Sequence, residues 1–343
     1  LNICWAFSGI PAGIASDKKD RIKLLLFMFL FVGIFSLALL LAHTFFGVFF
    51  LLVCLFLTIG IFHPPAYSFL SEGYSENRGR IIGTFETGGS IGTLIAPLVA
   101  GFVGSFLGWR YVYTLWALFA FVIAFLFYYL FCNNKNNKII KNEGHKIKIN
   151  GKKPPQGKSS SYSPYFRILF LTQGFFGFIS GGSISFLPLF LTDMHKFEVS
   201  TAGGMLTLFL AGGVVGKLLG GKYSDAGDAK KVVELGFILT AFFLILVPVL
   251  PGYLLSIALF PAGITFFMIL PAIFFLVGEV KTGDLGLAYG IHLLSGAGFG
   301  AISKFLCGVI SDAVGIRYIF FLLATVGFFA AFFVYNYLER APE

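Results

Sequence analysis

Residues 22–43 read IKLLLFMFLFVGIFSLALLLAH, and the one charged side chain among them, Lys23, lies near one end. A helix needs about 20 mostly apolar residues to cross the hydrocarbon core of a bilayer. A helix on the surface of a soluble domain keeps a polar face, which this stretch lacks. The stretch therefore predicts a helix that spans a membrane.

The whole chain has the composition of a membrane protein. Its 343 residues are 57% hydrophobic and only 12% charged, whereas soluble domains carry roughly 25% charged residues. Phe contributes 45 residues and Gly 42; Phe suits lipid-facing surface, and Gly lets helices approach closely. The four cysteines lie in or beside apolar runs without a CxxC pair. We interpret them as small buried hydrophobes and not as disulfide partners or metal ligands.

Ten further segments share this character, which predicts an all-α, polytopic fold. The eleven expected spans are 1–16, 22–43, 45–71, 79–104, 109–132, 166–192, 198–223, 231–249, 252–279, 285–311 and 316–338. Residues 133–165 form a basic stretch with eight lysines, two prolines at Pro154 and Pro155, and a serine run. We therefore predict an N-terminal helix bundle at 1–132, a solvated linker at 133–165 and a C-terminal bundle at 166–343.

Basic residues are distributed unevenly between the two sides of this topology. With the linker in the cytoplasm, 20 of the 25 Lys and Arg residues fall in cytoplasmic segments. The expected external loops hold only Arg110, Lys196 and Arg317, while Lys217 and Lys304 fall inside spans. The bias follows the positive-inside rule, so the net charge of +9 reflects topology and not nucleic-acid binding. We expect a plasma-membrane protein whose linker and C-terminus are cytoplasmic.

The two halves of the chain repeat at a separation of 207 residues. The matched pairs include Pro64 with Pro271, Glu72 with Glu279, Gly79 with Gly286, Gly83 with Gly290, Gly89 with Gly296, Gly108 with Gly315 and Arg110 with Arg317. A separation of 208 aligns Gly13 and Asp17 with Gly221 and Asp225. The first helix of the second half has no counterpart, so the repeat predicts one leading helix before residue 1. Parallel six-helix repeats are typical of transporters whose substrate site lies between the halves.

Residues 13–23 read GIASDKKDRIK and resemble the loop between helices 2 and 3 of the major facilitator superfamily, whose pattern is G-x-x-x-D-R/K-x-G-R/K-x-R/K. Residues 221–225, GKYSD, resemble its second-half copy, and the resemblance covers essentially the whole chain. It implies that superfamily's fold, two pseudo-repeats of six helices, with eleven of the twelve helices present.

The resemblance also implies a gating role for five residues, which are Gly13, Asp17, Arg21, Gly221 and Asp225. In the family, the aspartates face the positive end of a neighbouring helix and hold the cytoplasmic side shut. A charged, solvated loop is the plainer interpretation of the same residues. Asp20 stands where the family has Gly, and we expect a left-handed turn there because Asp tolerates one.

Two other stretches resemble exporters of the family. Residues 92–101, GTLIAPLVAG, resemble the helix 5 motif of its antiporters, with Ala replacing Gly twice. Residues 62–66, FHPPA, resemble fosmidomycin-resistance-type efflux members. The arginine that many drug–proton antiporters carry in helix 4 is absent from 45–71. The resemblance implies secondary transport of a small organic solute by alternating access, with proton-coupled efflux favoured over uptake by a proton symporter. A sensor or scaffold that does not transport is the alternative from another class.

Four ionisable residues in or beside spans are candidates for ion coupling or substrate binding: Glu86, Lys217, His63 and Lys304. Glu86 and Lys217 each lie about seven residues from the cytoplasmic end of their helix. By the family fold these helices are neighbours, so we hypothesise that the two meet as a gate or a proton-dependent switch. Alternatively, Lys217 reaches for the interface and Glu86 stays neutral. His63 either titrates near neutral pH or is a packed ring, and Lys304 either attracts an anionic solute or reaches for the interface.

The helix expected at 166–192 is rich in glycine, with Gly177, Gly181 and Gly182, and contains Pro188. These residues indicate either a binding site with exposed backbone or close helix packing. No glycine-rich phosphate loop, metal-ligand cluster or nucleophile–base pair stands out, so we expect no enzyme activity, cofactor or metal. The expected partners are a small-molecule substrate, a proton or another coupling ion, and the lipid bilayer, for a protein that is a monomer and binds no nucleic acid.

Overall fold

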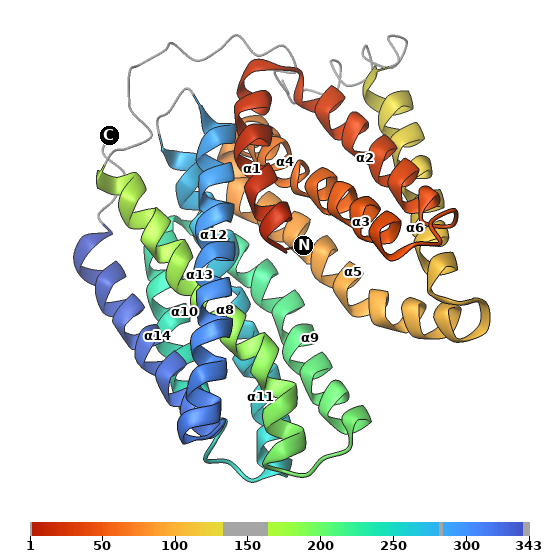
Figure 1. Ribbon diagram of the computed structural model, residues 1–343. Coiled ribbons are helices and arrows are strands. Elements are labelled where there is room, and N and C mark those ends of the chain that lie inside the picture. The colour runs from red at the N-terminus through yellow and green to blue at the C-terminus, as the bar shows by residue number, and fades with distance from the viewer. Residues whose placement is uncertain (1, 133–163, 281–283, 339–343) are drawn as a thin grey trace. The chain divides into compact units, whose positions relative to one another are not determined.

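The structure is a computed structural model that describes residues 2–132, 164–280 and 284–338. Every regular element in these ranges is a helix (Figure 1). The first half contains α1 (Asn2–Lys18), α2 (Arg21–Ala38), α3 (Phe45–Gly60), α4 (His63–Gly73), η1 (Ser75–Asn77), α5 (Arg78–Leu107), α6 (Trp109–Phe127) and η2 (Tyr128–Cys132). The second half contains α8 (Pro164–Asp193), α9 (Val199–Tyr223), η3 (Ser224–Asp228), α10 (Ala229–Leu246), α11 (Gly252–Phe267), α12 (Ile269–Glu279), α13 (Leu285–Val314) and α14 (Arg317–Tyr337).

These helices confirm the all-α, polytopic fold class. In the described ranges, seven helical segments are long and apolar enough to cross a membrane by themselves: Arg21–Ala38, Phe45–Gly73, Trp109–Phe131, Pro164–Asp193, Gly252–Glu279, Leu285–Val314 and Arg317–Tyr337. A bilayer core offers no water to backbone groups, so a spanning segment satisfies them within its own helix. The predicted linker at 133–165, with its eight lysines, lies outside the described residues except for the start of α8.

Prolines break one expected span in each half. The span at 45–71 is divided between α3 and α4, and α4 starts directly before Pro64 and Pro65. The span at 252–279 is divided between α11 and α12, two residues before Pro271. Proline has no N–H to donate to the carbonyl four residues earlier, and its ring crowds that carbonyl. The two breaks therefore follow from prolines that occupy equivalent places in the repeat.

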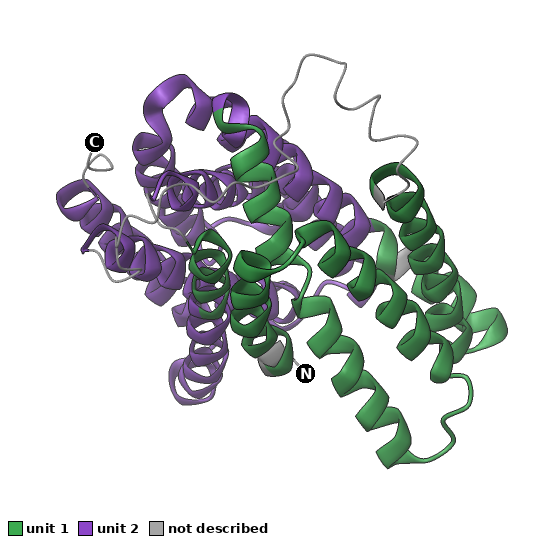
Figure 2. Cartoon of the chain, turned by 90° about the horizontal axis from the view of Figure 1, so that it is seen from above, with its two compact units in different colours: residues 1–75, 95–161, 281–294 green, residues 76–94, 162–280, 295–343 purple. Residues whose placement is uncertain are grey.

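The chain forms two compact units, each built from both halves of the sequence (Figure 2). Unit 1 comprises residues 1–75, 95–161 and 281–294, and unit 2 comprises residues 76–94, 162–280 and 295–343. Within unit 1, α2 packs against α6 and α1 against α3. Within unit 2, α9 packs against α11 and α10 against α14. The division into bundles at 1–132 and 166–343 stays a prediction.

The backbone repeats where two helices begin. Gly108 precedes α6 with a φ of +94°, and Gly315 lies two residues before α14 with a φ of +109°. Few residues other than glycine adopt this left-handed conformation without strain. The same backbone turn therefore occurs twice, 207 residues apart.

The left-handed turn expected at Asp20 was a wrong prediction. Asp20 has an extended conformation, with φ −66° and ψ 114°, and is the N-cap of α2. Its side chain accepts hydrogen bonds from the backbone N–H groups of Ile22 and Lys23 at 3.0 and 3.3 Å. Only Lys19 and Asp20 separate α1 from α2, and an N-cap aspartate in this conformation satisfies the first donors of the new helix.

Candidate functional site

Asp17 binds the start of a helix in unit 1. Its carboxylate accepts hydrogen bonds from the backbone N–H groups of Gly286 and Leu287, at 2.7 and 2.9 Å, in the first turn of α13. Burial raises the pKa of Asp17 above its ordinary value, and the two N–H donors and Arg21 oppose that rise. The first turn of a helix offers free N–H donors and a partial positive charge, which suits an anion. We refer to this contact between α1 and α13 as the Asp17 latch.

Gly13 and Arg21 complete this latch. A Cβ atom on Gly13 would collide with the carbonyl oxygen of Gly286, so glycine is required for α1 to approach α13. Arg21 donates two parallel hydrogen bonds to the carboxylate of Glu72, at 2.6 and 2.8 Å, and lies 4.0 Å from Asp17. A two-pronged Arg–carboxylate pair fixes geometry as well as charge. Arg21 therefore ties the end of α4 to the latch.

Asp225 makes the equivalent contact within unit 2. Its carboxylate accepts hydrogen bonds from the N–H groups of Gly79 and Arg80, at 2.6 and 2.7 Å, in the first turn of α5. A Cβ atom on Gly221 would collide with the carbonyl oxygen of Gly79. The position equivalent to Arg21 is Ala229, whose side chain carries no charge. Unit 2 thus repeats the aspartate latch with an uncharged side chain at the position that corresponds to Arg21.

Glu86 of α5 and Lys217 of α9 form a buried ion pair in unit 2. The Lys217 Nζ lies 2.8 Å from Glu86 Oε2 and 3.3 Å from the backbone oxygen of Glu86. The two residues are only 8% and 7% exposed. The structure therefore brings together the two residues that the sequence places at similar depth.

The ion pair has no equivalent in the other half of the repeat. Glu86 corresponds to Leu293, and Lys217 corresponds to Gly9. Gly9 instead packs against Gly290, where α1 meets α13. The two helix crossings share glycines and a latch aspartate, but the crossing of α5 and α9 alone buries two opposite charges. Ionisable groups are costly inside a membrane and are usually retained for function.

His63 is the first residue of α4 and belongs to a column of rings in unit 1. Its ring meets Trp5 edge to face with centroids 5.7 Å apart, and it stacks on Tyr67 at 5.6 Å. Tyr67 stacks in turn on Tyr289 of α13 at 5.2 Å. The Tyr289 hydroxyl lies 2.5 Å from the Ser71 hydroxyl. His63 is therefore a packed ring at the crossing of α1, α4 and α13. A role of His63 in substrate binding or ion coupling stays a prediction.

Lys304 and the glycines of α8 have contrasting surroundings. Lys304 is exposed on α13. In α8, a Cβ atom on Gly177 or Gly181 would collide with the carbonyl oxygen of Gly296 or Gly300. Close helix packing thus accounts for these α8 glycines, and of the two interpretations of this helix it is the one that the contacts support.

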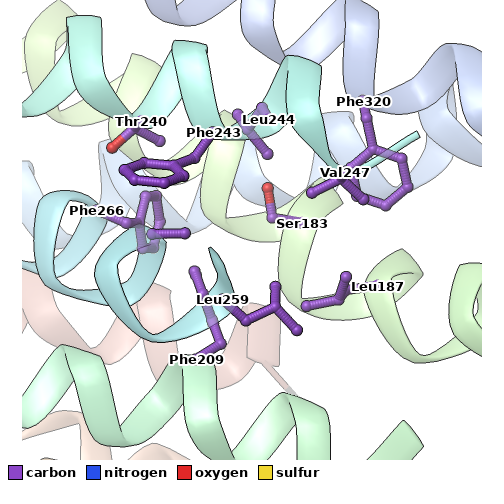
Figure 3. A pocket seen from close by; sticks show the side chains of 11 residues that line it. Ser183, Leu187, Phe209, Thr240, Phe243, Leu244, Val247, Leu259, Phe266 and Phe320 are labelled. Atoms are coloured by element: carbon purple, nitrogen blue, oxygen red, sulfur yellow. The ribbon is translucent and has the colours of Figure 1, made fainter. Parts of the chain in front are cut away.

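A small cavity lies inside unit 2 among five helices (Figure 3). It is lined by Ser183, Leu187, Phe209, Thr240, Phe243, Leu244, Val247, Leu259, Ala262, Phe266 and Phe320. Its volume is about 20 Å³, whereas one water molecule needs roughly 10–15 Å³ on the same measure. The cavity has room for about one water and is too small for an organic solute.

Comparison with known proteins decides the family. The sequence profile of the Major Facilitator Superfamily matches residues 3–279 and 169–343, which together include nearly the whole chain. The chain belongs to the Major Facilitator Superfamily. Members of this superfamily are transporters and not enzymes, and they bind small-molecule substrates in a lipid bilayer. The family resemblance and the transporter class are thereby confirmed, and the protein is a multi-pass membrane protein.

The chain is similar to curated superfamily members named for drug resistance. It is 26% identical over 361 residues to the multidrug resistance protein MdtG of Yersinia enterocolitica, which covers 100% of this chain and 83% of the relative. The match to MdtG of Salmonella arizonae is 25% identical over 359 residues and covers 99% of this chain and 84% of the relative.

Solved structures of the superfamily share the fold. The Escherichia coli fucose:proton symporter FucP matches with a TM-score of 0.76 at 15% identity, over 100% of this chain and 90% of FucP. A XylE variant matches with a TM-score of 0.80 at 14% identity, over 99% of this chain and 85% of XylE. The human organic anion transporter MFSD10 matches with a TM-score of 0.76 at 16% identity, over 97% of this chain and 83% of MFSD10. Identities this low show the superfamily fold alone.

Sequence reasoning missed three residues at these sites. Tyr289 and Ser71 have no charge and no motif, and their pairing depends on how α4 and α13 are rotated. Phe267 of α11 places its ring centroid 5.6 Å from the Lys217 Nζ. It is one of 45 phenylalanines in the chain, so nothing in the sequence distinguishes it from rings that face lipid.

Proposed function

We propose that this transporter exports a small organic solute in exchange for protons, and that Glu86 is the group that takes up and releases the proton. The observation that carries the proposal is the buried ion pair of Glu86 and Lys217. The pair lies on α5 and α9, and the Asp225 latch joins the start of α5 to η3, which directly follows α9. A change of charge at Glu86 therefore acts on the contact that the latch closes.

Protonation of Glu86 removes one charge of a buried pair. Lys217 is then left as a buried cation without its carboxylate. Removing one partner of such a pair is unfavourable by about 3–5 kcal/mol, because the remaining charge is not compensated. The crossing of α5 and α9 is relieved of this strain if the two helices separate and water reaches Lys217. Protonated Glu86 thus favours release of the crossing, and ionised Glu86 favours its closure.

Close backbone contacts between the two helices extend along the crossing from the ion pair to the latch. Gly79 packs against Gly221, and a Cβ atom on Gly83 would lie 2.6 Å from the Lys217 carbonyl oxygen. At the end of this series of contacts, the Asp225 carboxylate accepts a hydrogen bond from the N–H of Gly79. Packing this close does not deform gradually, since one helix backbone lies directly against the other. Loss of the ion pair at one end therefore favours loss of the latch at the other.

The two latches have different parts in this proposal. The Asp17 latch in unit 1 is clamped by Arg21 and Glu72, and its helix crossing has Leu293 and Gly9 at the positions that correspond to the ion pair. The Asp225 latch has Ala229 at the position that corresponds to Arg21, and it adjoins the proton-binding pair. We therefore assign proton sensing to α5 and α9, and assign to Asp17 a closing contact that responds to the solute. His63 and Lys304 are retained as candidates for solute binding.

Direction of transport is part of the proposal. The relatives named for multidrug resistance support export. The stretches at 62–66 and 92–101, which resemble exporters of the family, also favour export. FucP, a fucose:proton symporter, shares the fold, so uptake with protons is the second candidate. We further propose a monomer in the plasma membrane with the linker and the C-terminus in the cytoplasm, as the distribution of lysines and arginines supports.

Reconstituted vesicles test the function. The protein is placed in vesicles that are acidic inside and contain a pH-sensitive dye, and candidate solutes are added one at a time. If the protein exchanges solute for protons, adding the solute should release protons from the vesicles. This release should be absent in Glu86→Gln and retained in the control Glu76→Gln, which changes an exposed residue. A solute that raises the thermal stability of the protein but releases no protons would contradict proton exchange and favour uniport, another ion or a sensor.

A further inference from the structure

Phe267 lies at the break in the span formed by α11 and α12. It is the last residue of α11, and Met268 separates it from α12. Its carbonyl oxygen would accept the N–H of residue 271 in a continuous helix, but residue 271 is a proline and has no N–H to donate. Phe267 is therefore attached to the part of this span that bends most readily.

The ring of Phe267 faces the buried lysine of the ion pair. Its centroid is 5.6 Å from the Lys217 Nζ, within the range over which an aromatic face attracts a cation. A membrane lysine this close to a helix end would ordinarily extend its side chain toward water. Lys217 is instead only 7% exposed, and its ammonium contacts both the Phe267 ring and the Glu86 carboxylate.

Two features hold the ring in this place. Gly213 lies one turn before Lys217 on α9, and a Cβ atom there would collide with the Phe267 ring. Phe267 also packs against Phe209 and Phe266, with ring centroids 5.5 and 4.8 Å away. The glycine opens the space beside α9 and the two rings fill the remainder, so the aromatic face is directed at the ammonium.

We propose that Phe267 is a positioning residue for the proton-binding pair: its ring holds the Lys217 ammonium against Glu86 and connects this pair to the bend between α11 and α12. Motion at the bend withdraws the ring, and Lys217 then holds the carboxylate less firmly. The inference rests on the proposed function for its effect on transport. The contact between ring and ammonium stands on geometry alone.

The chemistry predicts how a change at Phe267 alters proton coupling. Leucine is apolar and somewhat smaller and lacks the aromatic face, so Phe267→Leu keeps most of the apolar packing and removes the attraction for the cation. A carboxylate with a less firmly held counterion binds a proton at a lower proton concentration. The pH at which proton exchange is half-maximal should therefore rise by roughly one pH unit, the size that a desolvated cation–π contact implies. Phe267→Trp retains an aromatic face and should restore the profile.

The transport experiment measures solute-driven proton release against pH for the wild type, Phe267→Leu and Phe267→Trp. Phe176→Leu is the matched control, since Phe176 is a buried ring of unit 2 that stacks on Phe266 at 4.8 Å. A displaced profile for Phe267→Leu alone supports the positioning role. Equal profiles for Phe267→Leu and the wild type, or an equal displacement for Phe176→Leu, would overturn it.

A stability experiment separates this inference from the proposed function. Thermal unfolding is measured for Phe267→Leu, Lys217→Met and the double variant. A contact between ring and ammonium predicts that Phe267→Leu lowers stability less in the Lys217→Met background than in the wild type. Equal effects in both backgrounds contradict the contact. Unequal effects together with normal proton exchange by Glu86→Gln would keep the contact and reject Glu86 as the proton carrier.

Discussion

Gly83 lies directly against the backbone of Lys217, so that a Cβ atom on Gly83 would come within 2.6 Å of the Lys217 carbonyl oxygen. This contact is one turn from Glu86 on α5, and it sets the distance across which the Glu86 carboxylate meets the Lys217 ammonium. The close approach of the two backbones and the burial of the two charges are therefore one feature of the α5–α9 crossing.

Gly83→Ala should destabilise this crossing. The added methyl group forces α5 and α9 apart, and overpacking of this kind lowers the free energy of unfolding by about 1–3 kcal/mol. Thermal unfolding of the purified protein measures the loss. Gly88→Ala is the matched control, because Gly88 is on the same helix with open space beside it. Equal stability for Gly83→Ala and Gly88→Ala would show that the helices are not in close contact.

Asp225→Asn should weaken the latch of unit 2. The amide keeps the shape of the side chain but loses the charge that two N–H groups at the start of α5 stabilise. We expect the free energy of unfolding to fall by about 1–2 kcal/mol. Asp228→Asn, only three residues further on, removes a surface pair with Lys231 at 3.0 Å and should change it by less than about 0.5 kcal/mol. A similar loss in both variants would count against the latch.

Arg21→Lys tests the clamp of unit 1. A lysine keeps the positive charge but cannot make two parallel hydrogen bonds to Glu72. Glu72 is partly exposed, so the loss of stability should be modest, about 0.5–1 kcal/mol. It should vanish when Glu72 is already replaced by Gln. An equal loss in the Glu72→Gln background would mean that Arg21 acts through another contact.

The loop between α8 and α9 should respond to acid through His195. Burial lowers the pKa of His195 below its usual value, and its ring stacks on Phe197 and meets Phe190 edge to face. The packed loop therefore prefers the neutral ring. Its stability is fully present above about pH 6.5, the pKa of a histidine in an unfolded chain, and it is lost as the pH falls below that value.

Hydrogen exchange measures this effect. Backbone N–H groups at 194–198 should exchange faster at pH 5 than at pH 7, after correction for the intrinsic pH dependence of exchange. His195→Phe keeps the stacking without a titrating group and should remove the difference between the two pH values. If the wild type shows no such difference, His195 does not control the loop.

The helices and the repeat could be predicted from the sequence because the bilayer restricts what a span can be. Long apolar runs give helices that satisfy their own backbone groups, and prolines at Pro64 and Pro271 mark the two breaks. Gly13, Asp17 and their copies at Gly221 and Asp225 could be matched because a close helix approach tolerates only glycine. Glu86 and Lys217 could be paired because the family resemblance makes their helices neighbours and both residues lie at a similar distance from a helix end.

Contacts that depend on helix rotation could not be predicted. The stacking of His63 on Tyr67, the hydroxyl pair of Ser71 and Tyr289, and the ring of Phe267 beside Lys217 all require the angle at which helices cross. A chain so rich in aromatic residues gives no sign of which rings face inward. Asp20 was interpreted through the glycine of the family pattern, but the short connection there is stabilised by capping of the next helix.

The most direct test of the central claim is proton exchange by charge-swapped variants in vesicles. Glu86→Lys and Lys217→Glu are made singly and together, and solute-driven proton release is measured beside the wild type. If the two residues act as a coupled pair, each single variant loses most of the exchange and the double variant recovers a substantial part. If the double variant is no more active than either single variant, or if the single variants exchange protons normally, the pair does not couple proton movement to transport.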